Sequence, residues 1–418
     1  MADVHDVEIL CFVAHYPPAV LGGGPARTLE GMVDACATPA KVAIVTADRD
    51  HGADSPLPVE SNAWLTRAGA WTWYSSGGLL QVARTMREAA RLKPRYVYLN
   101  SVFHPVFAIL PILLKRLGAW GAAELVIAPR GELDPGALRL KTPKKRTYLA
   151  VARRLGFFSR ATWHASTDTE ATFVAAELRS ARRILVKENE TVLPRQALPR
   201  PARPRSQPRS LVYVGRISPK KQLELLLEGL ARVRRDFRLE IVGAADDAAY
   251  LRRLQALASG LGDRVRWHGP ASREEVFERL TEADIACFPT AGENFGHVVA
   301  EALASSCPVV IMDVTPWTAH VLRGGGEIVE ESTAQAWGET LDRMLAEPVA
   351  ALEARGRAAS AAYESWRCSV DGRSLFDYLL QDQHGALVTS PVTSPVTSPV
   401  TSPVTSPVTS PVTSRGPR

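Results

Sequence analysis

The sequence predicts an α/β protein with two parallel-sheet domains and a low-complexity tail. Short apolar segments of strand length alternate with segments of helical periodicity in both halves of the 418-residue chain, a pattern typical of doubly wound sheets. Between the halves, residues 194–210 are rich in Pro and Arg, which disfavours regular structure. We therefore expect domains at residues 1–193 and 211–365, joined by an exposed, stiff linker at residues 194–210.

The expected elements follow from the local pattern. Each strand is a short apolar run, as burial on both faces requires, and each helix carries a 3.6-residue apolar period. In the first half the expected strands are residues 7–14, 41–46, 95–100, 124–128 and 161–164, with helices at 26–36, 77–92 and 104–117. In the second half the expected strands are residues 211–215, 238–243, 265–269, 284–288 and 309–312, with helices ending near 235, starting at 297, and running from about 334 to 380.

The last 31 residues form a separate segment. From Val388 the chain repeats Val-Thr-Ser-Pro six times and ends in VTSRGPR. Proline at every fourth position excludes a helix or a central strand, and the apolar content is too low for a core. We expect residues 388–418 to be disordered, as a tether or as an inert repeat expansion.

Composition limits the partners. The net charge of +6 suits anionic ligands such as nucleotide diphosphates, or an anionic membrane surface. The five cysteines are scattered without metal-ligand spacing and resemble reduced thiols. The N-terminus lacks the pattern of a secretory signal, and no apolar segment reaches the roughly 20 residues of a membrane span. A cytoplasmic location, with peripheral contact at the inner face of the membrane, is expected.

Residues 283–310 read as strand, turn, helix and strand. Glu293 lies in the turn, beside the start of the helix, and Glu301 lies eight residues on, about one helical turn in. The free N–H groups of residues 294–296 would form a cradle for anions and hydroxyls. Such a pair could hold a sugar nucleotide at both ends, although two unrelated acids on a soluble helix would look the same.

These residues carry a family resemblance. Glu293-Asn294-Phe295-Gly296 through Glu301-Ala302-Leu303 resembles the two-glutamate signature of glycosyltransferase family 4. These are retaining enzymes of the GT-B fold, in which two Rossmann-like doubly wound domains face each other across a cleft. The resemblance implies that Glu301 anchors the donor ribose. It also implies that Glu293, with the amides of Asn294, Phe295 and Gly296, holds the donor sugar.

A second motif follows the first strand of the second half. Arg216 comes directly after LVYVG, and Lys221 lies five residues further on, the spacing found in family 4. There both cations hold the donor diphosphate, and the resemblance implies catalytic roles for Arg216, Lys221 and Glu293. An Arg can bind phosphate bidentately and a Lys acts as a mobile point charge. Lys220 is the weaker candidate, as a solvated surface lysine.

The first half supplies a glycine loop. Gly22-Gly23-Gly24-Pro25 opens a helix, and such a loop leaves the backbone amides unobstructed for an anion. It resembles the glycine-rich first loop of family 4, which faces the cleft. We therefore count Gly23 and Gly24 as donor-binding. The D-x-D tripeptide at Asp48 to Asp50 is set aside, because the family works without a metal.

Two cleft candidates and a basic segment remain. Arg130 lies in a P-R-G-x-L motif like that of polysaccharide and lipopolysaccharide family 4 enzymes, and His164 ends a strand that would reach the cleft. Either could contact the acceptor, with a structural histidine as the alternative. The basic run Arg139, Lys141, Lys144, Lys145 and Arg146 would bind an anionic acceptor or lipid headgroups, or simply be a solvated face. The fold also implies that residues 366–387 are a helix crossing back to the first domain.

The sequence thus favours a metal-independent retaining hexosyltransferase. It would move a sugar from a nucleotide diphosphate donor onto a glycan or lipid-linked acceptor in cell-surface polysaccharide synthesis. No cofactor is expected beyond the donor as co-substrate, and no nucleic acid partner. Two alternatives stay open: a sugar-nucleotide epimerase of the same fold, and a non-catalytic nucleotide-sugar binding module.

Overall fold

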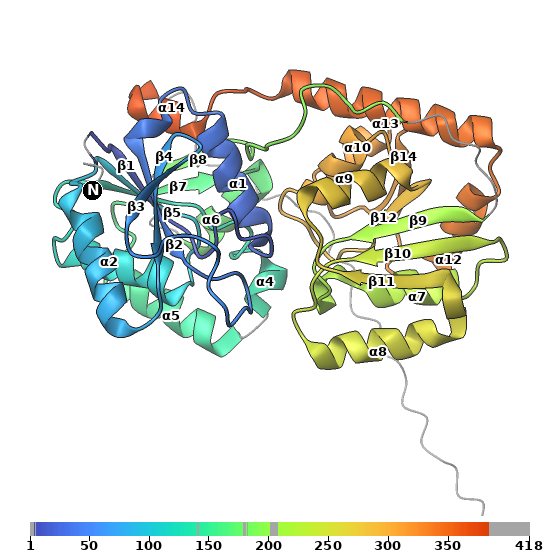
Figure 1. Ribbon diagram of the computed structural model, residues 1–418, viewed down its shortest axis with the longest axis horizontal. Coiled ribbons are helices and arrows are strands. Elements are labelled where there is room, and N and C mark those ends of the chain that lie inside the picture. Colours follow the sequence, from blue (N-terminus) through green and yellow to red (C-terminus); the bar gives the residue numbers. More distant parts are fainter. Residues whose placement is uncertain are drawn as a thin grey trace, which may run out of the picture.

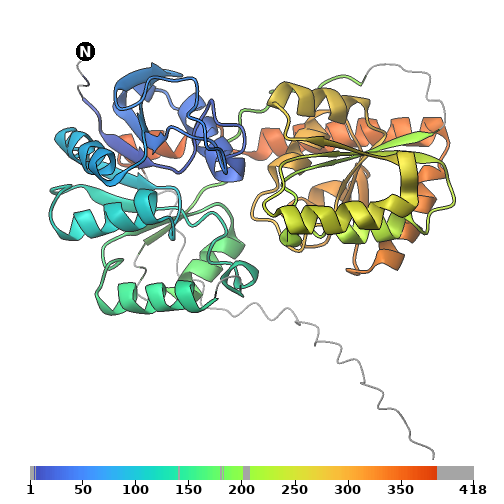
Figure 2. The same cartoon turned by 60° about the horizontal axis from the view of Figure 1, so that its bottom comes forward.

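The computed structural model describes residues 4, 6–139, 142–178, 181, 183–200 and 208–383. Two α/β domains lie side by side, each a mainly parallel sheet covered by helices on both faces (Figures 1 and 2). The disorder expected for residues 388–418 falls outside the described residues. No helix in the described part of the chain is long and apolar enough to cross a membrane. Four of the five cysteines are buried and Cys368 is exposed.

The first sheet centres on the apolar strand after residue 8. Strands β3 and β4 are antiparallel, and the other neighbours are parallel, with Ile9 opposite both Val42 and Tyr96. Within the described residues the strand order is β3 (Trp64–Arg67), β4 (Ala70–Ser75), β2 (Val42–Ala47), β1 (Ile9–Phe12), β5 (Tyr96–Leu99), β6 (Glu124–Ile127), β7 (Thr162–Ala165) and β8 (Arg183–Val186). Sequence reasoning did not foresee β3, β4 or β8.

Alternating side chains place two cores on the two faces of this sheet, as strand geometry requires. Leu10 and Phe12 point to one core, and Ile9 and Cys11 to the other. The first core is covered by α2 (Leu79–Arg91), α3 (Leu110–Arg116), α4 (Pro135–Arg139), α5 (Thr142–Arg154) and α6 (Asp168–Glu177). The second is covered by α1 (Gly23–Asp34) and α14 (Leu375–Leu380).

The second sheet is wholly parallel among its described strands. Their order is β11 (Val265–Gly269), β10 (Phe237–Val242), β9 (Arg209–Val214), β12 (Ile285–Phe288), β13 (Val309–Met312) and β14 (Gly326–Val329). One face packs against α7 (Leu223–Leu230), α8 (Ala248–Ala258) and α12 (Ala334–Leu345), and the other against α9 (Arg273–Glu282), α10 (His297–Ala304), α11 (Thr318–Val321) and α13 (Val349–Ser369). Strand β14 was not foreseen.

The strand orders fix where a ligand site can form. The direction of chain progression reverses between β1 and β5 in the first sheet and between β9 and β12 in the second. Open parallel sheets bind ligands at the carboxyl ends of the strands at such a reversal. The loops that follow β1, β9 and β12 are therefore the segments where the two domains can build a shared site.

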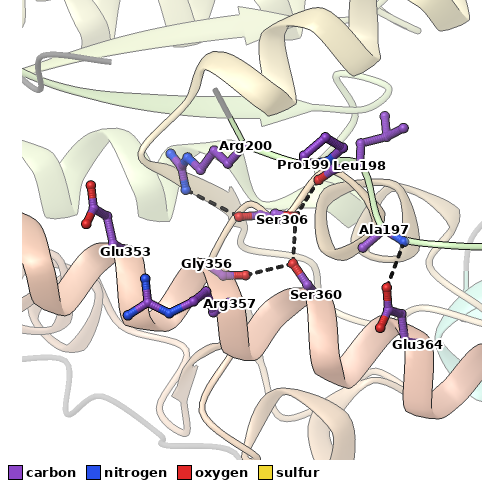
Figure 3. Close-up of a pocket in the computed structure, with 10 residues that line it drawn as sticks. All are labelled: Ala197, Leu198, Pro199, Arg200, Ser306, Glu353, Gly356, Arg357, Ser360 and Glu364. Atoms are coloured by element: carbon purple, nitrogen blue, oxygen red, sulfur yellow. Dashed lines mark hydrogen bonds between the residues drawn. The ribbon is translucent and has the colours of Figure 1, made fainter. Parts of the chain in front are cut away.

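The expected exposed linker is wrong for its first half, because residues 194–200 pack along the second domain (Figure 3). The Ala197 N–H donates to a Glu364 carboxylate oxygen (3.3 Å), and the Ser306 hydroxyl donates to the Leu198 carbonyl (2.6 Å). Arg200 donates to the Ser306 carbonyl at 3.3 Å. A pocket of about 360 Å³ remains between this segment and α13. Proline disfavours helix and strand, but the backbone N–H and carbonyl groups of this segment still form hydrogen bonds with α13 and with Ser306.

The single helix expected over residues 366–387 is, within the described residues up to 383, two helices. Helix α13 ends at Ser369 on the second domain, and α14 begins after a cap at Ser374 on the first domain (Figure 1). The Ser374 hydroxyl donates to the Met32 carbonyl (2.6 Å), and the Leu375 N–H donates to Glu190 (2.7 Å). The break lets apolar residues of α14 face the first core, whereas those at the end of α13 face the second.

Candidate active site

The two cations expected at the diphosphate follow β9. Arg216 is half-exposed and lies 3.5 Å from Asp246. Its Nε is 4.0 Å from the point where a Cβ on Gly23 would stand, so the glycine loop of the first domain faces it. Lys221 ends a short 3₁₀ helix (Pro219–Lys221), and its ammonium group forms an ion pair with the Glu293 carboxylate. Lys221 and Glu293 are therefore paired in the second domain, and Arg216 of the same domain faces Gly23 of the first domain.

The turn after β12 leaves the start of α10 uncapped. Gly296 is the N-cap residue, with φ at 82°, and no side chain caps the helix. This left-handed conformation strains residues that carry a Cβ. The first N–H groups of a helix have no partner within it and carry the positive end of the helix dipole. With Lys221 beside it, the turn is suited to an anionic ligand.

Buried aromatic rings hold this turn from below. The Trp317 indole N–H donates to the Phe295 carbonyl (2.6 Å), and the Phe295 ring stacks edge-on against Trp317 at 5.6 Å. Phe295 is only 3% exposed. The Phe295 side chain therefore belongs to the core, and the expectation that its backbone amide holds the donor stays a prediction. The sequence pattern did not predict this role of Trp317.

Glu301 lies at the domain boundary, not in an open site. It is 2% exposed, and its Oε1 is ion-paired with Arg27 of α1 in the first domain. Its Oε2 is buried and has no hydrogen-bond partner in the described structure. The ring of His297 lies 3.4 Å from the position of a Cβ on Gly24. Glu301 of the second domain and Gly24 of the first domain therefore each contact a residue of the other domain.

Asn294 contacts the first domain with its side chain. Its amide donates to the Ser166 hydroxyl at 2.9 Å, and Ser166 in turn donates to Glu170 (2.8 Å). The same carboxylate accepts the Gly131 N–H at 2.6 Å. The Asn294 side chain is therefore used for an interdomain contact, while the expected role of its backbone amide at the donor stays a prediction. Sequence reasoning missed Glu170 as the centre of this network.

The two acceptor candidates of the first domain are corrected. His164 is fully buried, with Nδ1 2.8 Å from the Tyr98 hydroxyl and Nε2 3.0 Å from the Lys187 carbonyl. Arg130 donates to Asn100 (2.7 Å), to Asn189 and to Tyr98 (2.6 Å). Both side chains are held inside the first domain. We expected the end of β7 to reach the cleft. Side chains alternate between the two faces of the sheet along a strand, and His164 points to the face where Tyr98 and Lys187 contact it.

The D-x-D tripeptide is structural. Asp50 accepts the N–H groups of Val20 and Leu21, at 2.8 and 3.0 Å, and so holds the loop before α1. No group of three or more His, Cys, Asp or Glu side chains among the described residues could hold a metal ion. Metal independence stays a prediction, which turnover with and without a chelator would test.

His297 is held neutral at the boundary. Partial burial, and then the positive charges of Arg27, Arg130, Arg273 and Lys221, lower its pKa to about 3. Its Nε2 lies 3.1 Å from the Thr28 hydroxyl of α1. At neutral pH the imidazole therefore contributes a hydrogen bond but no positive charge.

The depressed pKa of His297 predicts an acid-sensitive fold. The unfolded histidine takes up a proton below about pH 6.5, whereas the folded one does so only near pH 3. Stability should therefore be complete above pH 6.5 and fall as the pH drops towards 3, by up to about 1.4 kcal/mol per pH unit. Urea unfolding at pH 7.5 and 5.0 should show a smaller pH effect for His297→Asn than for the wild type. The same change in unfolding free energy between pH 7.5 and 5.0 in both proteins would contradict this assignment.

The missed residues cluster on α1. Arg27, Thr28 and Glu30 all contact the second domain, at Glu301, His297 and Arg273. The available signal was their place in the first turns after the glycine loop, which directs this helix end to the cleft. Their partners lie 243 to 274 positions away, so sequence spacing could not reveal them.

The second domain matches a known protein family. Residues 194–365 match the family model described as glycosyl transferases group 1. The second domain carries the glycosyltransferase group 1 pattern. Two D-inositol 3-phosphate glycosyltransferases are similar. That of Xylanimonas cellulosilytica is 33% identical over 156 residues, covering 36% of this chain and 37% of the relative. That of Mycolicibacterium smegmatis is 33% identical over 179 residues, 40% and 41% of the two chains. The chain thus spans less than half the length of these curated relatives.

Solved structures extend the likeness to both domains. Sucrose-phosphate synthase from Thermosynechococcus elongatus superposes with a TM-score of 0.72 at 19% identity, covering 91% of this chain and 99% of that one. Anabaena Alr3699/HepE, in complex with UDP and glucose, gives 0.66 at 15% identity, with 91% and 100% covered. At these identities the likeness shows the fold. The predicted GT-B arrangement of two Rossmann-like domains is confirmed.

Proposed function

We propose that this protein is a retaining glycosyltransferase that moves a sugar from a nucleotide diphosphate donor to a hydroxyl of a glycan or lipid-linked acceptor. The observation that carries the proposal is the grouping of Lys221, Glu293 and the uncapped start of α10 at the strand-order reversal. This grouping lies inside the segment that matches the family model. Lys221 and Arg216 would oppose the charge that develops on the departing diphosphate.

A cavity beside the proposed donor site supports a non-anionic acceptor. A cavity of about 450 Å³ borders Glu293 and Asn294 and reaches Asp134 and Phe173 of the first domain and Asp313 of the second. Its lining includes four carboxylates and no Lys, Arg or His from the described residues. Glu293 and Glu170 are already engaged with Lys221, Gly131 and Ser166. Asp134 and Asp313 would repel a phosphate group there, whereas sugar hydroxyls could donate to these two carboxylates. myo-Inositol and inositol 3-phosphate form a matched probe pair, and we expect the unphosphorylated member to be the better acceptor.

Contact with an anionic membrane is a separate proposal. On α5, Lys144 and Arg146 are exposed, and Val151 and Leu155 nearby are 48% and 52% exposed. Such a mixture of cations and apolar groups suits headgroup binding. Lys145 is engaged elsewhere, because its ammonium donates to the Ala137 carbonyl at 2.7 Å. Sedimentation with phosphatidylglycerol vesicles, against phosphatidylcholine vesicles as control, tests this contact.

A donor screen followed by product analysis tests the function. A nucleotide sugar at about 100 times its Kd should stabilise the fold by about 2.7 kcal/mol, visible as a rise in Tm. With an acceptor, NMR should show transfer with retained anomeric configuration. A changed sugar nucleotide formed without acceptor would instead support an epimerase. Binding without any turnover would support a binding module, and a bound nucleotide on the first domain alone would overturn the proposed site.

A further inference from the structure

Helix α1 of the first domain contacts the second domain through three neighbouring residues. Arg27 forms an ion pair with Glu301 of α10, the Thr28 hydroxyl lies 3.1 Å from His297 Nε2, and Glu30 lies 2.6 Å from Arg273 of α9. A cavity of about 370 Å³ lies beside these contacts. Its lining includes Arg27, Glu30 and Arg273, with the glycine loop on one side and the start of α9 on the other.

The Arg27–Glu301 contact leaves one carboxylate oxygen of Glu301 without a hydrogen-bond donor among the described residues. Glu301 is 2% exposed, and its Oε1 is taken by Arg27. Its Oε2 is buried and has no hydrogen-bond partner among the described residues. Buried carboxylate oxygens are normally satisfied, and an unsatisfied one is unfavourable. A hydroxyl donor arriving at Oε2 would remove this penalty, and the guanidinium would already balance the negative charge.

We propose that Arg27 is a positioning residue for the ribose of the bound nucleotide. This inference rests on the proposed function, with Glu301 as the acceptor of a ribose hydroxyl that the family resemblance implies. Arg27 occupies Oε1 and fixes the carboxylate so that Oε2 is presented to that hydroxyl. Because Arg27 belongs to the first domain and Glu301 to the second, the ribose contact depends on residues of both domains.

The test compares nucleoside diphosphates with their 2′,3′-dideoxy counterparts by isothermal titration calorimetry. UDP, GDP and ADP are the probes, and the tightest-binding base is carried forward. In the wild type the dideoxy form should bind about tenfold or more weakly, because a hydrogen bond to a charged acceptor is lost. In Glu301→Gln and in Arg27→Ala this ratio should fall towards one. Arg27→Lys should restore part of it, since it keeps the charge but loses the planar fork.

The matched control is Glu30→Gln. This substitution breaks the second ion pair between the domains, to Arg273, without touching Glu301. It should leave the ratio of the two affinities unchanged, even if both affinities fall. Circular dichroism and Tm establish that each variant is folded.

Three results separate the failures. If Arg27→Ala weakens both nucleotides equally and keeps the ratio, Arg27 is only structural and the inference is overturned. If Arg27→Ala tightens binding, Arg27 competes with the ribose, which also overturns it. If none of the three nucleoside diphosphates binds the wild type, the proposed function itself fails, and the inference with it.

Discussion

Lys221→Ala should lower kcat/KM for the donor. The fall should correspond to a loss of roughly 2–4 kcal/mol in transition-state stabilisation, the scale of losing one preorganised charge-stabilising group. Lys221 is the cation that the structure pairs with Glu293 beside the start of α10. Charge on the diphosphate grows as the glycosidic bond breaks, so this contact should strengthen towards the transition state. Steady-state kinetics should therefore show a fall in kcat as well as a rise in donor KM.

Lys220→Ala is the matched control for this effect. The contacts of Lys220 at the site are made by its backbone, whose carbonyl accepts the Ala291 N–H at 2.9 Å. Truncating its side chain should leave that contact in place and change kcat/KM little. Were Lys220→Ala the impaired variant and Lys221→Ala normal, the register of the phosphate site would be wrong by one residue.

Trp317→Ala should lower the free energy of unfolding by roughly 3–5 kcal/mol, the usual cost of truncating a large buried aromatic residue. Trp317 is 1% exposed and packs against Trp366 at a ring distance of 4.9 Å. Its indole also holds the Phe295 carbonyl at 2.6 Å, directly below the start of α10. The variant should therefore lose both stability and donor affinity, measured by urea unfolding and by titration calorimetry.

A second buried tryptophan separates these two effects. Trp337 is fully buried on the opposite face of the same sheet, where its indole lies 3.3 Å from the Met312 sulfur. Trp337→Ala should cost a similar amount of stability but leave donor affinity intact at a temperature where the protein is folded. Equal losses of affinity in both variants would show that the turn at Phe295 does not depend on Trp317.

Local patterns foretold much of the fold because they are local in origin. The stretch from Ile285 to Met312 was predicted as strand, turn, helix and strand, and it is β12, a glycine turn, α10 and β13. Apolar runs bounded by Gly and Pro carry that information within a few residues. The antiparallel β3–β4 pair was missed, since residues 64–75 mix Trp, Thr and Arg without a clear apolar run. Its stability comes from pairing with β2, which is a tertiary contact.

The sequence by itself determined the two-domain α/β architecture and the side of the cleft where Arg216, Lys221 and Glu293 gather. These residues follow strand ends, and parallel strands bring their carboxyl ends to one edge. Only the tertiary structure decided which side chains face the cleft. His164 and Arg130 turned into the first domain, and Arg27 reached Glu301 across 274 positions. Side-chain direction and interdomain pairing depend on the neighbours that packing supplies, and those neighbours are remote in sequence.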